Sequence, residues 1–137
     1  MSKEPTKVTI DTNVIISALI FGGNSKIIVE KLLKREFVAF TSIQLVSELV
    51  ETLLIKFIFT KEMILKLDAL IVSNFVVVYP TKRINVARDI DDNRVLEVAV
   101  TSNSKYIITG DKDLLVIKRY KNIDIISPKE FINNDQI

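Results

Sequence analysis

Two aspartates follow short apolar runs whose ends could meet in a fold. Asp11 comes directly after Val8–Ile10, and Asp111 follows Tyr106–Thr109 by one residue. Short runs of this kind, bounded by polar residues, are typical of buried strands in a parallel sheet. Ligands of open α/β sheets bind beyond the carboxyl ends of the strands. In a strand order 3-2-1-4-5 the first and fourth strands are neighbours, so we expect the two carboxylates side by side at that edge.

A third carboxylate, that of Asp92, is expected at the same edge. Asp92 opens a predicted helix over 92–103, and a helix that leads into a parallel strand starts at this edge. Asp91 is rotated away and Asp89 precedes the helix, which makes both poorer candidates. Helical spacing places Asp92 on one face with the apolar residues Val95, Leu96 and Ala99. A carboxylate that faces inward without a cationic partner is costly unless another charge offsets it.

The helix predicted after the second strand carries two candidate glutamates. Glu48 lies two turns into this helix, ~9 Å below the edge at ~1.5 Å per residue, within reach of a long side chain. Glu51 is its rival, because both glutamates flank the apolar stripe of the helix. Periodicity does not choose between them.

Each acidic candidate also has a purely structural interpretation. Helix capping would explain Asp11 with Asn13, and Asp111 or Asp113. The helix dipole would favour Asp92, and Glu48 alone would be a solvated residue. Convergence favours a site, because carboxylates gathered at one edge repel and raise each other's pKa values unless a cation is present. Mg²⁺ or Mn²⁺ is the cation that suits an all-oxygen site.

Composition restricts the chemistry further. The 137 residues are 48% hydrophobic and 26% charged, with a net charge of +2, as expected for one globular domain. The absence of cysteine and histidine excludes disulfides, thiolate or histidine metal sites and Ser-His-Asp chemistry. Residues 1–5 lack the apolar segment of a signal peptide, and no uncharged run reaches the ~18 residues of a membrane span. These features predict a soluble, cytoplasmic protein.

Strands and helices alternate along the chain. The predicted strands are 7–11, 37–41, 75–79, 106–109 and 123–126. The predicted helices are 13–20, one capped by Asn24 or Ser25 and running to Lys34, one capped by Thr41 and running to Lys56, 61–73 and 92–103. A short helical turn is predicted at Leu114-Leu115, and a last short helix starts after Ser127. Capping boxes are predicted for Thr41 with Gln44 and for Ser127 with Glu130. This order predicts an α/β fold, a three-layer α/β/α sandwich around a central parallel sheet of about five strands. Residues 1–137 form a single domain in this prediction, with a flexible tail over 134–137.

Several segments, in this order and spacing, resemble the PIN-domain family of metal-dependent ribonucleases. Within it they are most similar to the branch of toxin components of toxin–antitoxin pairs. The resemblance covers Val8 to Phe131, and the closing Ile126–Phe131 is also similar to this branch. Ile90 stands where the branch often has proline. The segments are Ile10-Asp11-Thr12-Asn13-Val14, Ser47-Glu48-Leu49, Asp89-Ile90-Asp91-Asp92-Asn93 leading into Leu96-Glu97, and Ile108-Thr109-Gly110-Asp111-Lys112-Asp113-Leu114.

The resemblance implies an acidic quartet that binds Mg²⁺ or Mn²⁺ and hydrolyses RNA. It selects Glu48 over Glu51 and implies supporting roles for three polar residues. The quartet is Asp11, Glu48, Asp92 and Asp111, supported by Asn13, Thr109 and Asp113. The implied partners are RNA, a small antitoxin protein and a second copy of the chain. A homodimer interface could use Ile55, Phe57, Ile58 and Phe59, although a buried core would explain these residues equally well.

Four basic residues are candidates for holding the RNA backbone: Lys112, Arg94, Lys82 and Arg83. Most surface lysines and arginines, however, only solubilise a protein. A haloacid-dehalogenase-like phosphatase is an alternative function, since its first strand also ends in aspartate. That family has a second aspartate two residues later, where this chain has Asn13. A non-catalytic RNA- or protein-binding module on the same fold is a further alternative.

Overall fold

The fold is built around one six-stranded sheet. The computed structural model describes residues 4–134, and their sheet has the order β3-β2-β1-β4-β6-β5. The strands are β1 (Lys7–Ile10), β2 (Val38–Thr41), β3 (Phe75–Val77), β4 (Tyr106–Ile108), β5 (Arg119–Tyr120) and β6 (Ile123–Ile126). All neighbours pair in parallel except β5 and β6. The predicted order 3-2-1-4-5 is confirmed, with β6 as the fifth strand. The two-residue β5 was missed because a strand this short leaves no alternating pattern.

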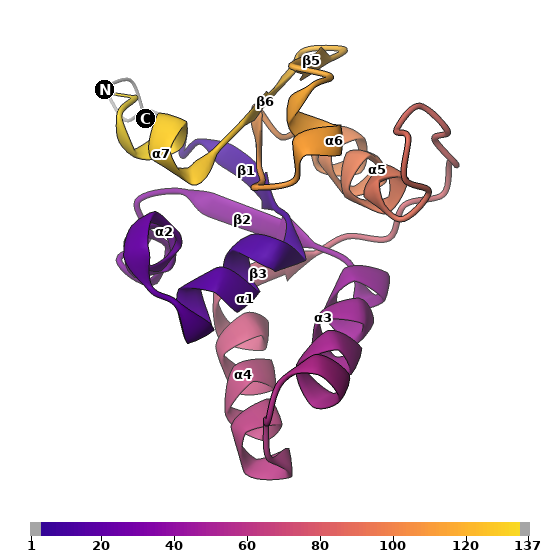
Figure 1. The fold of residues 1–137 in the computed structure, drawn as a ribbon. Coiled ribbons are helices and arrows are strands. Elements are labelled where there is room, and N and C mark those ends of the chain that lie inside the picture. Colours follow the sequence, from indigo (N-terminus) through magenta and orange to yellow (C-terminus); the bar gives the residue numbers. More distant parts are fainter. Residues whose placement is uncertain (1–3, 135–137) are drawn as a thin grey trace.

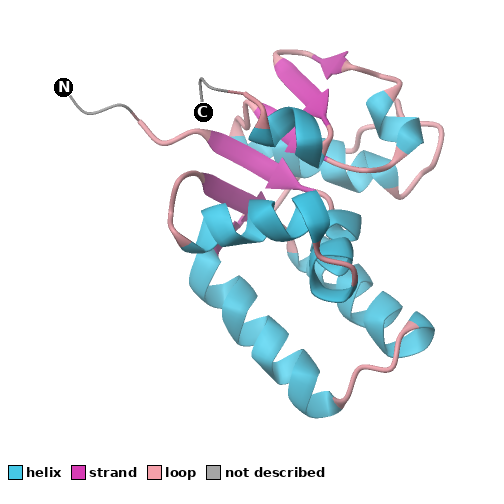
Figure 2. Ribbon diagram, turned by 60° about the vertical axis from the view of Figure 1, so that its left-hand side comes forward, coloured by secondary structure: helices cyan, strands magenta, loops and turns pink. Residues whose placement is uncertain are grey.

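Helices cover both faces of the sheet (Figures 1 and 2). The longest, α3 and α4, run away from the sheet together and are joined at their far ends by a short loop (Figure 1). The helices are α1 (Thr12–Ile20), α2 (Gly23–Leu33), α3 (Ile43–Lys56), α4 (Lys61–Asn74), α5 (Asp92–Ser102), α6 (Lys112–Leu115) and α7 (Pro128–Ile132). The three-layer α/β/α prediction therefore describes the observed architecture.

Alternation along the central strands divides the interior into two cores. In β4, Ile108 packs into the core that also contains buried residues of α1 to α4, whereas Ile107 packs into the core that contains α5. In β2, Ala39 and Phe40 divide in the same way. Because successive side chains of a strand point to opposite faces, this apolar run supplies both layers at once. The strands are thus held from both sides, which fixes the position of their carboxyl ends.

Local capping agrees only partly with the sequence prediction. Ser127 and Glu130 form the predicted capping box at the start of α7, with proline in the first turn. Thr41 does not cap α3, because it remains in β2 and pairs with β3. Ser42 is the cap instead, and its hydroxyl oxygen accepts from the backbone of Leu45 at 3.2 Å. The cap of α2 is Gly22 at φ +79°, not Asn24 or Ser25.

The apolar residues near the end of α3 do not all serve the same purpose. Phe57 and Phe59 are half-buried and pack against the core shared by α1 to α4. Ile55 and Ile58 are 72% and 97% exposed. Both interpretations of this segment therefore apply, each to a different pair of residues. Of these four residues, Ile55 and Ile58 are the two exposed to a partner.

Asn134, the first residue of the predicted flexible tail, donates a 3.0 Å hydrogen bond to the hydroxyl of Tyr106, and 135–137 lie outside the described residues. Within residues 4–134, no individual helix is long and apolar enough to cross a membrane; α1 and α2 pass such a test only together, with a bend of 105° between them.

Candidate metal centre

The site lies where β1 and β4 end side by side. Asp11 follows β1, and its backbone N–H donates to the Ile108 carbonyl of β4 at 3.0 Å. Asp111 follows β4 after two residues. Both aspartates also cap helices: Asp11 Oδ1 accepts from the backbone of Asn13 at 3.4 Å, and Asp111 Oδ1 from that of Asp113 at 2.8 Å. Capping uses one oxygen of each carboxylate, so each aspartate can cap its helix and also take part in a metal site.

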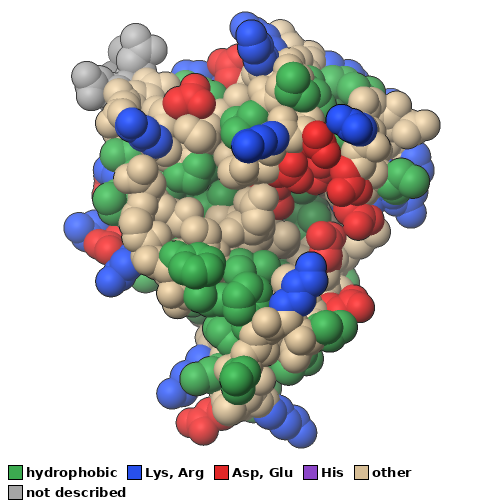
Figure 3. All heavy atoms as spheres, viewed as in Figure 1, with side chains coloured by type: hydrophobic (Ala, Val, Ile, Leu, Met, Phe, Trp, Pro, Cys, Tyr) green, Lys and Arg blue, Asp and Glu red, His purple; other side chains and the backbone are tan. Residues whose placement is uncertain are grey.

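Three carboxylates meet at this edge. One oxygen each of Asp11, Asp92 and Asp111 lies within 4.8 Å of the other two. Asp11 and Asp92 are 6% and 8% exposed, and Asp92 arrives from the first turn of α5. Acidic side chains gather in one patch on the face seen in Figure 3. The structure thus brings together the three aspartates that the sequence placed at the same edge.

The hydroxyl of Thr109 links two members of the triad. It donates a 2.7 Å hydrogen bond to Asp11 Oδ2, and its oxygen accepts from the backbone N–H of Asp111 at 3.0 Å. Asn13 acts nearby, because its Oδ1 accepts from the backbone of Gly110 at 3.4 Å. Thr109 is fully buried. Its contacts and that of Asn13 hold the loop after β4 against the loop after β1.

The electrostatics of the triad are unfavourable without a cation. Burial, together with the negative charge of the neighbouring Asp111, raises the pKa of Asp92 from an ordinary 3.8 to about 8. Burial also raises the pKa of Asp11, although the hydrogen bonds from Thr109 and the backbone partly oppose this effect. Among the described residues, no lysine or arginine forms an ion pair with the triad.

Within residues 4–134, one carboxylate oxygen of the triad lacks a hydrogen-bond partner, as expected of an atom that binds a cation. Asp92 Oδ2 is buried and has no hydrogen-bond partner among the described residues. Buried polar atoms in proteins almost always have a partner. A small divalent cation with oxygen ligands would satisfy this atom and offset the three gathered charges. The residues present therefore fit Mg²⁺ or Mn²⁺.

Glu48 lies beside the triad. Burial raises the pKa of its half-buried carboxyl, and Asp91, Asp11 and Asp89 raise it further, so it belongs to the same acidic region. It is outside the group of carboxylates within 4.8 Å of one another. Its rival Glu51 is exposed. Asp89 and Asp91, the poorer candidates, are exposed and add negative charge near the site.

Asp113 occupies the first turn of α6 next to the triad. Its side chain is half-buried, and its backbone N–H donates to Asp111 Oδ1. The residue that caps α6 is therefore Asp111, and the carboxylate of Asp113 does not act as the cap. The outer-shell role that the resemblance implies for Asp113 stays a prediction.

The basic candidates fall into two groups. Lys82 and Lys112 are exposed. Arg94 is mostly buried, and its Nη2 contacts Glu97 Oε2 at 2.8 Å, while Arg83 Nη1 lies 3.7 Å from Glu97 Oε1. No role was predicted for Glu97 from the sequence, although Arg94 and Glu97 are three residues apart, a spacing that allows an ion pair on a helix. That spacing does not predict that the pair is mostly buried, with side chains 14% and 5% exposed.

Comparisons with known proteins agree with this architecture. The PIN domain family matches residues 7–113, a span that contains all four members of the predicted quartet. The chain belongs to the PIN-domain family. An uncharacterized protein of Methanocaldococcus jannaschii is 37% identical to this PIN domain over 145 residues, which cover 96% of this chain and 93% of the relative.

A solved structure has the same fold. The crystal structure of VapBC2 from Rickettsia felis, bound to a DNA fragment from their promoter, matches this PIN domain with a TM-score of 0.64. The match covers 89% of this chain and 98% of the other, at 15% sequence identity. At this identity the likeness shows the fold, and the site must be argued from the residues themselves.

Proposed function

We propose that this PIN domain is a divalent-metal-dependent endoribonuclease that hydrolyses phosphodiester bonds in single-stranded or looped RNA. The observation that supports this most strongly is the buried triad of Asp11, Asp92 and Asp111, with one oxygen of Asp92 left unpaired. A binding module has no need for such electrostatic strain. Membership of the PIN-domain family points to the same chemistry.

The triad would hold one or two ions of Mg²⁺ or Mn²⁺. When bound, such an ion promotes ionisation of water near neutral pH and neutralises charge that develops on the phosphate oxygens. Asp11 and Asp111 are already oriented by Thr109 and by their helix caps. Glu48 and Asp113 would assist through direct or water-mediated contacts. Because the chain has no histidine, the leaving oxygen takes its proton from water.

Other carboxylate chemistry fits less well. A haloacid-dehalogenase-like phosphatase needs an acid two residues after Asp11, and Asn13 instead accepts a hydrogen bond from Gly110. A non-catalytic module on the same fold predicts that divalent ions leave the stability of the protein unchanged. Thermal unfolding with and without Mn²⁺ separates that alternative from the nuclease.

We further propose a cytoplasmic toxin role, with a small antitoxin protein as partner. The structurally similar VapBC2 from Rickettsia felis, which was solved bound to a DNA fragment from their promoter, supports this proposal. A homodimer is a second assembly that the exposed Ile55 and Ile58 would suit. A gene for a small DNA-binding protein beside the gene for this chain would support the toxin role.

The nuclease is tested with one substitution and its matched control. Asp11→Asn keeps a helix-capping side chain but removes a ligand charge, so it should abolish Mg²⁺- or Mn²⁺-dependent cleavage of RNA while the fold remains. Asp68→Asn changes an exposed aspartate of α4 and should cleave like the unmodified protein. Circular dichroism verifies the fold of both variants. Full activity of Asp11→Asn, or activity unaffected by EDTA, would show that the assignment is wrong.

A further inference from the structure

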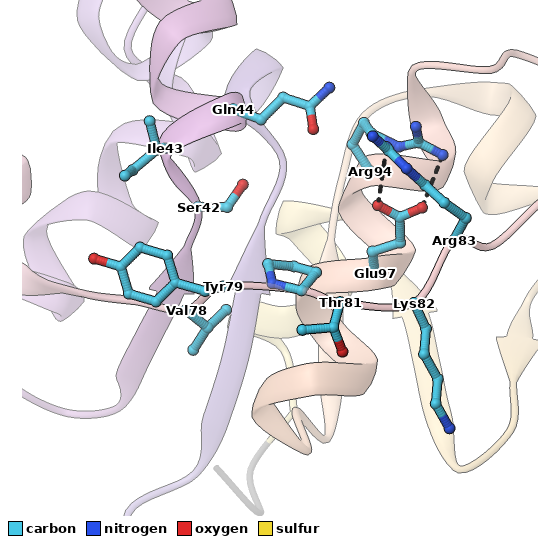
Figure 4. Close-up of a pocket in the computed structure, with 11 residues that line it drawn as sticks. Ser42, Ile43, Gln44, Val78, Tyr79, Thr81, Lys82, Arg83, Arg94 and Glu97 are labelled. Atoms are coloured by element: carbon cyan, nitrogen blue, oxygen red, sulfur yellow. Dashed lines mark ion pairs between the residues drawn. The ribbon is translucent and has the colours of Figure 1, made fainter.

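A cavity lies beyond the carboxyl ends of β2 and β3, outside the acidic triad (Figure 4). Its volume is about 340 Å³, within the range of small-molecule and nucleotide pockets. The start of α3, the chain after β3 and one side of α5 form its walls. We refer to it as the β2–β3 cavity; the side chains that matter here are Ser42, Gln44, Tyr79, Arg83, Arg94 and Glu97.

The β2–β3 cavity and the metal centre share one edge of the sheet. The cavity follows β2 and β3, as Asp11 and Asp111 follow β1 and β4, and β2 is the neighbour of β1. Adjacent strands are ~4.8 Å apart, so the strand ends beneath the cavity lie one and two such spacings from β1. A single strand of RNA lying along this edge with one phosphate at the triad would therefore place a neighbouring nucleotide at the cavity.

The charge of the cavity is opposite to that of the triad. Arg83, Arg94 and Lys82 line it together with one acid, Glu97, which leaves an excess of positive charge. Arg94 and Glu97 are buried and neutralise each other, with side chains 14% and 5% exposed. The side chain of Arg83 is 71% exposed, and its Nη1 lies 3.7 Å from Glu97 Oε1, a longer contact than that of Arg94. The side chain of Lys82 extends away from Arg83 and Glu97 (Figure 4). Arg83 is therefore the more exposed of the two guanidinium groups, and its longer contact with Glu97 leaves it able to hold a phosphate as well.

Neutral groups of the cavity suit a base. Tyr79 is 70% exposed, so it offers an aromatic surface on which a base can stack. Gln44 is exposed at the start of α3, and its amide has both a donor and an acceptor for a base edge. Ser42 is occupied, since its oxygen caps α3. Arg83 and Gln44 thus supply a phosphate contact and a polar edge, and Tyr79, whose ring points away from Arg83 in Figure 4, supplies a stacking surface on the opposite side of the cavity.

The loop that carries Arg83 is held in place before any ligand binds. Glu97 Oε2 accepts from the backbone of Ile84 at 2.9 Å. Asn93 Oδ1 accepts from the backbones of Val86 and Ala87 at 2.9 and 2.8 Å. Both acceptors are buried residues of α5, the helix that begins with Asp92. The same helix therefore positions a triad carboxylate and the loop beside the cavity, which lowers the ordering cost of binding.

We propose that the β2–β3 cavity is a nucleotide-binding subsite for the RNA segment next to the cleaved bond. Arg83 holds a phosphate, Tyr79 stacks on the base, and Gln44 reads its polar edge. This inference rests on the proposed nuclease function and adds to it a determinant of affinity and of cleavage position.

Binding is tested without cleavage, in the Asp11→Asn background. A fluorescein-labelled single-stranded RNA of mixed sequence is titrated by anisotropy at several salt concentrations. Arg83→Gln should weaken binding about fivefold to tenfold at low salt and reduce the slope of log K against log salt by ~1. Arg83→Lys should retain the salt slope, and Arg35→Gln, an exposed arginine before β2 at the opposite edge, should bind unchanged. Equal affinity of Arg83→Gln and Arg35→Gln would overturn the proposal.

The base contacts are tested by RNA binding in the Asp11→Asn background for Tyr79 and by RNA cleavage in the otherwise unmodified protein for Gln44. Tyr79→Ala should weaken RNA binding about tenfold, whereas Tyr79→Phe should keep the stacking and the affinity. Gln44→Ala should change the distribution of cleavage positions on a structured RNA, read by sequencing of the products. An unchanged affinity of Tyr79→Ala together with an unchanged cleavage pattern of Gln44→Ala would show that no base occupies the cavity.

Failure of the subsite and failure of the nuclease are distinguishable. If Asp11→Asn abolishes cleavage but the cavity variants behave like Arg35→Gln, the nuclease stands and the subsite is wrong. If the unmodified protein cleaves no RNA but Arg83→Gln still weakens RNA binding, the cavity binds RNA and the catalytic assignment is wrong.

Discussion

The hydroxyl of Thr109 donates to Asp11 Oδ2 across 2.7 Å, joining residues that are 98 positions apart in the chain. Its oxygen also accepts from the backbone of Asp111 at 3.0 Å. One buried hydroxyl thus orients a carboxylate at the end of β1 and the backbone at the end of β4. Replacing a group that orients a metal ligand in this way typically lowers metal affinity about 10- to 100-fold.

The first prediction concerns this hydroxyl. Thr109→Val keeps the shape of the side chain but leaves Asp11 Oδ2 and the Asp111 N–H without their partner. We expect a loss of about 1–3 kcal/mol in the free energy of unfolding. Mn²⁺ affinity should fall about 10- to 100-fold. Urea denaturation and calorimetric titration measure the two effects, and Thr109→Ser should restore both. Wild-type Mn²⁺ affinity in Thr109→Val would contradict the role assigned to Thr109.

The second prediction concerns pH in the absence of metal. Asp92 has a pKa of about 8 in the folded protein, against an ordinary value of 3.8. The folded state therefore binds the proton more tightly than the unfolded state, so stability falls as pH rises from about 4 to about 8. Urea midpoints measured in EDTA across this range should decrease. Asp92→Asn should flatten the decrease, since the amide does not titrate, and an equally steep decrease in that variant would refute the assignment.

A third prediction concerns metal addition. Mn²⁺ should stabilise the folded protein by about 2.7 kcal/mol at a concentration 100 times its dissociation constant, because it binds the folded state alone. The stabilisation should grow from pH 5 to pH 8, since protons compete for the triad. Thermal unfolding measures it, and Asp111→Asn should lose it while Asp68→Asn keeps it. A melting temperature that does not respond to Mn²⁺ would favour a non-catalytic module.

A fourth prediction compares two ion pairs. Glu97→Gln leaves the mostly buried Arg94 without its charge partner and should lower the free energy of unfolding by about 3 kcal/mol or more. Glu62→Gln breaks an exposed pair with Lys66 at 3.8 Å and should cost less than ~0.5 kcal/mol. Chemical denaturation of both variants tests this contrast. Similar small losses would mean that the buried pair contributes little.

Much of the fold was predictable because its signals are local. Apolar runs that end at Asp11 and near Asp111 predicted β1 and β4. Helical spacing predicted that Asp92 faces inward, and it is buried. Parallel topology then required these three residues to share an edge. The two-residue β5 escaped prediction because so short a strand leaves no alternating pattern. The shift of the α3 cap from Thr41 to Ser42 escaped it because it depends on how far β2 stays paired with β3.

The sequence by itself determined the order of the elements and the edge at which the aspartates meet, because strand and helix periodicity are properties of adjacent residues. Only the tertiary structure decided that Glu48 is half-buried while Glu51 is exposed, and that Phe57 is half-buried while Ile58 faces outward. It also decided that Arg83 stays accessible. These differences arise from packing between segments far apart in the chain, which no local pattern of residues records.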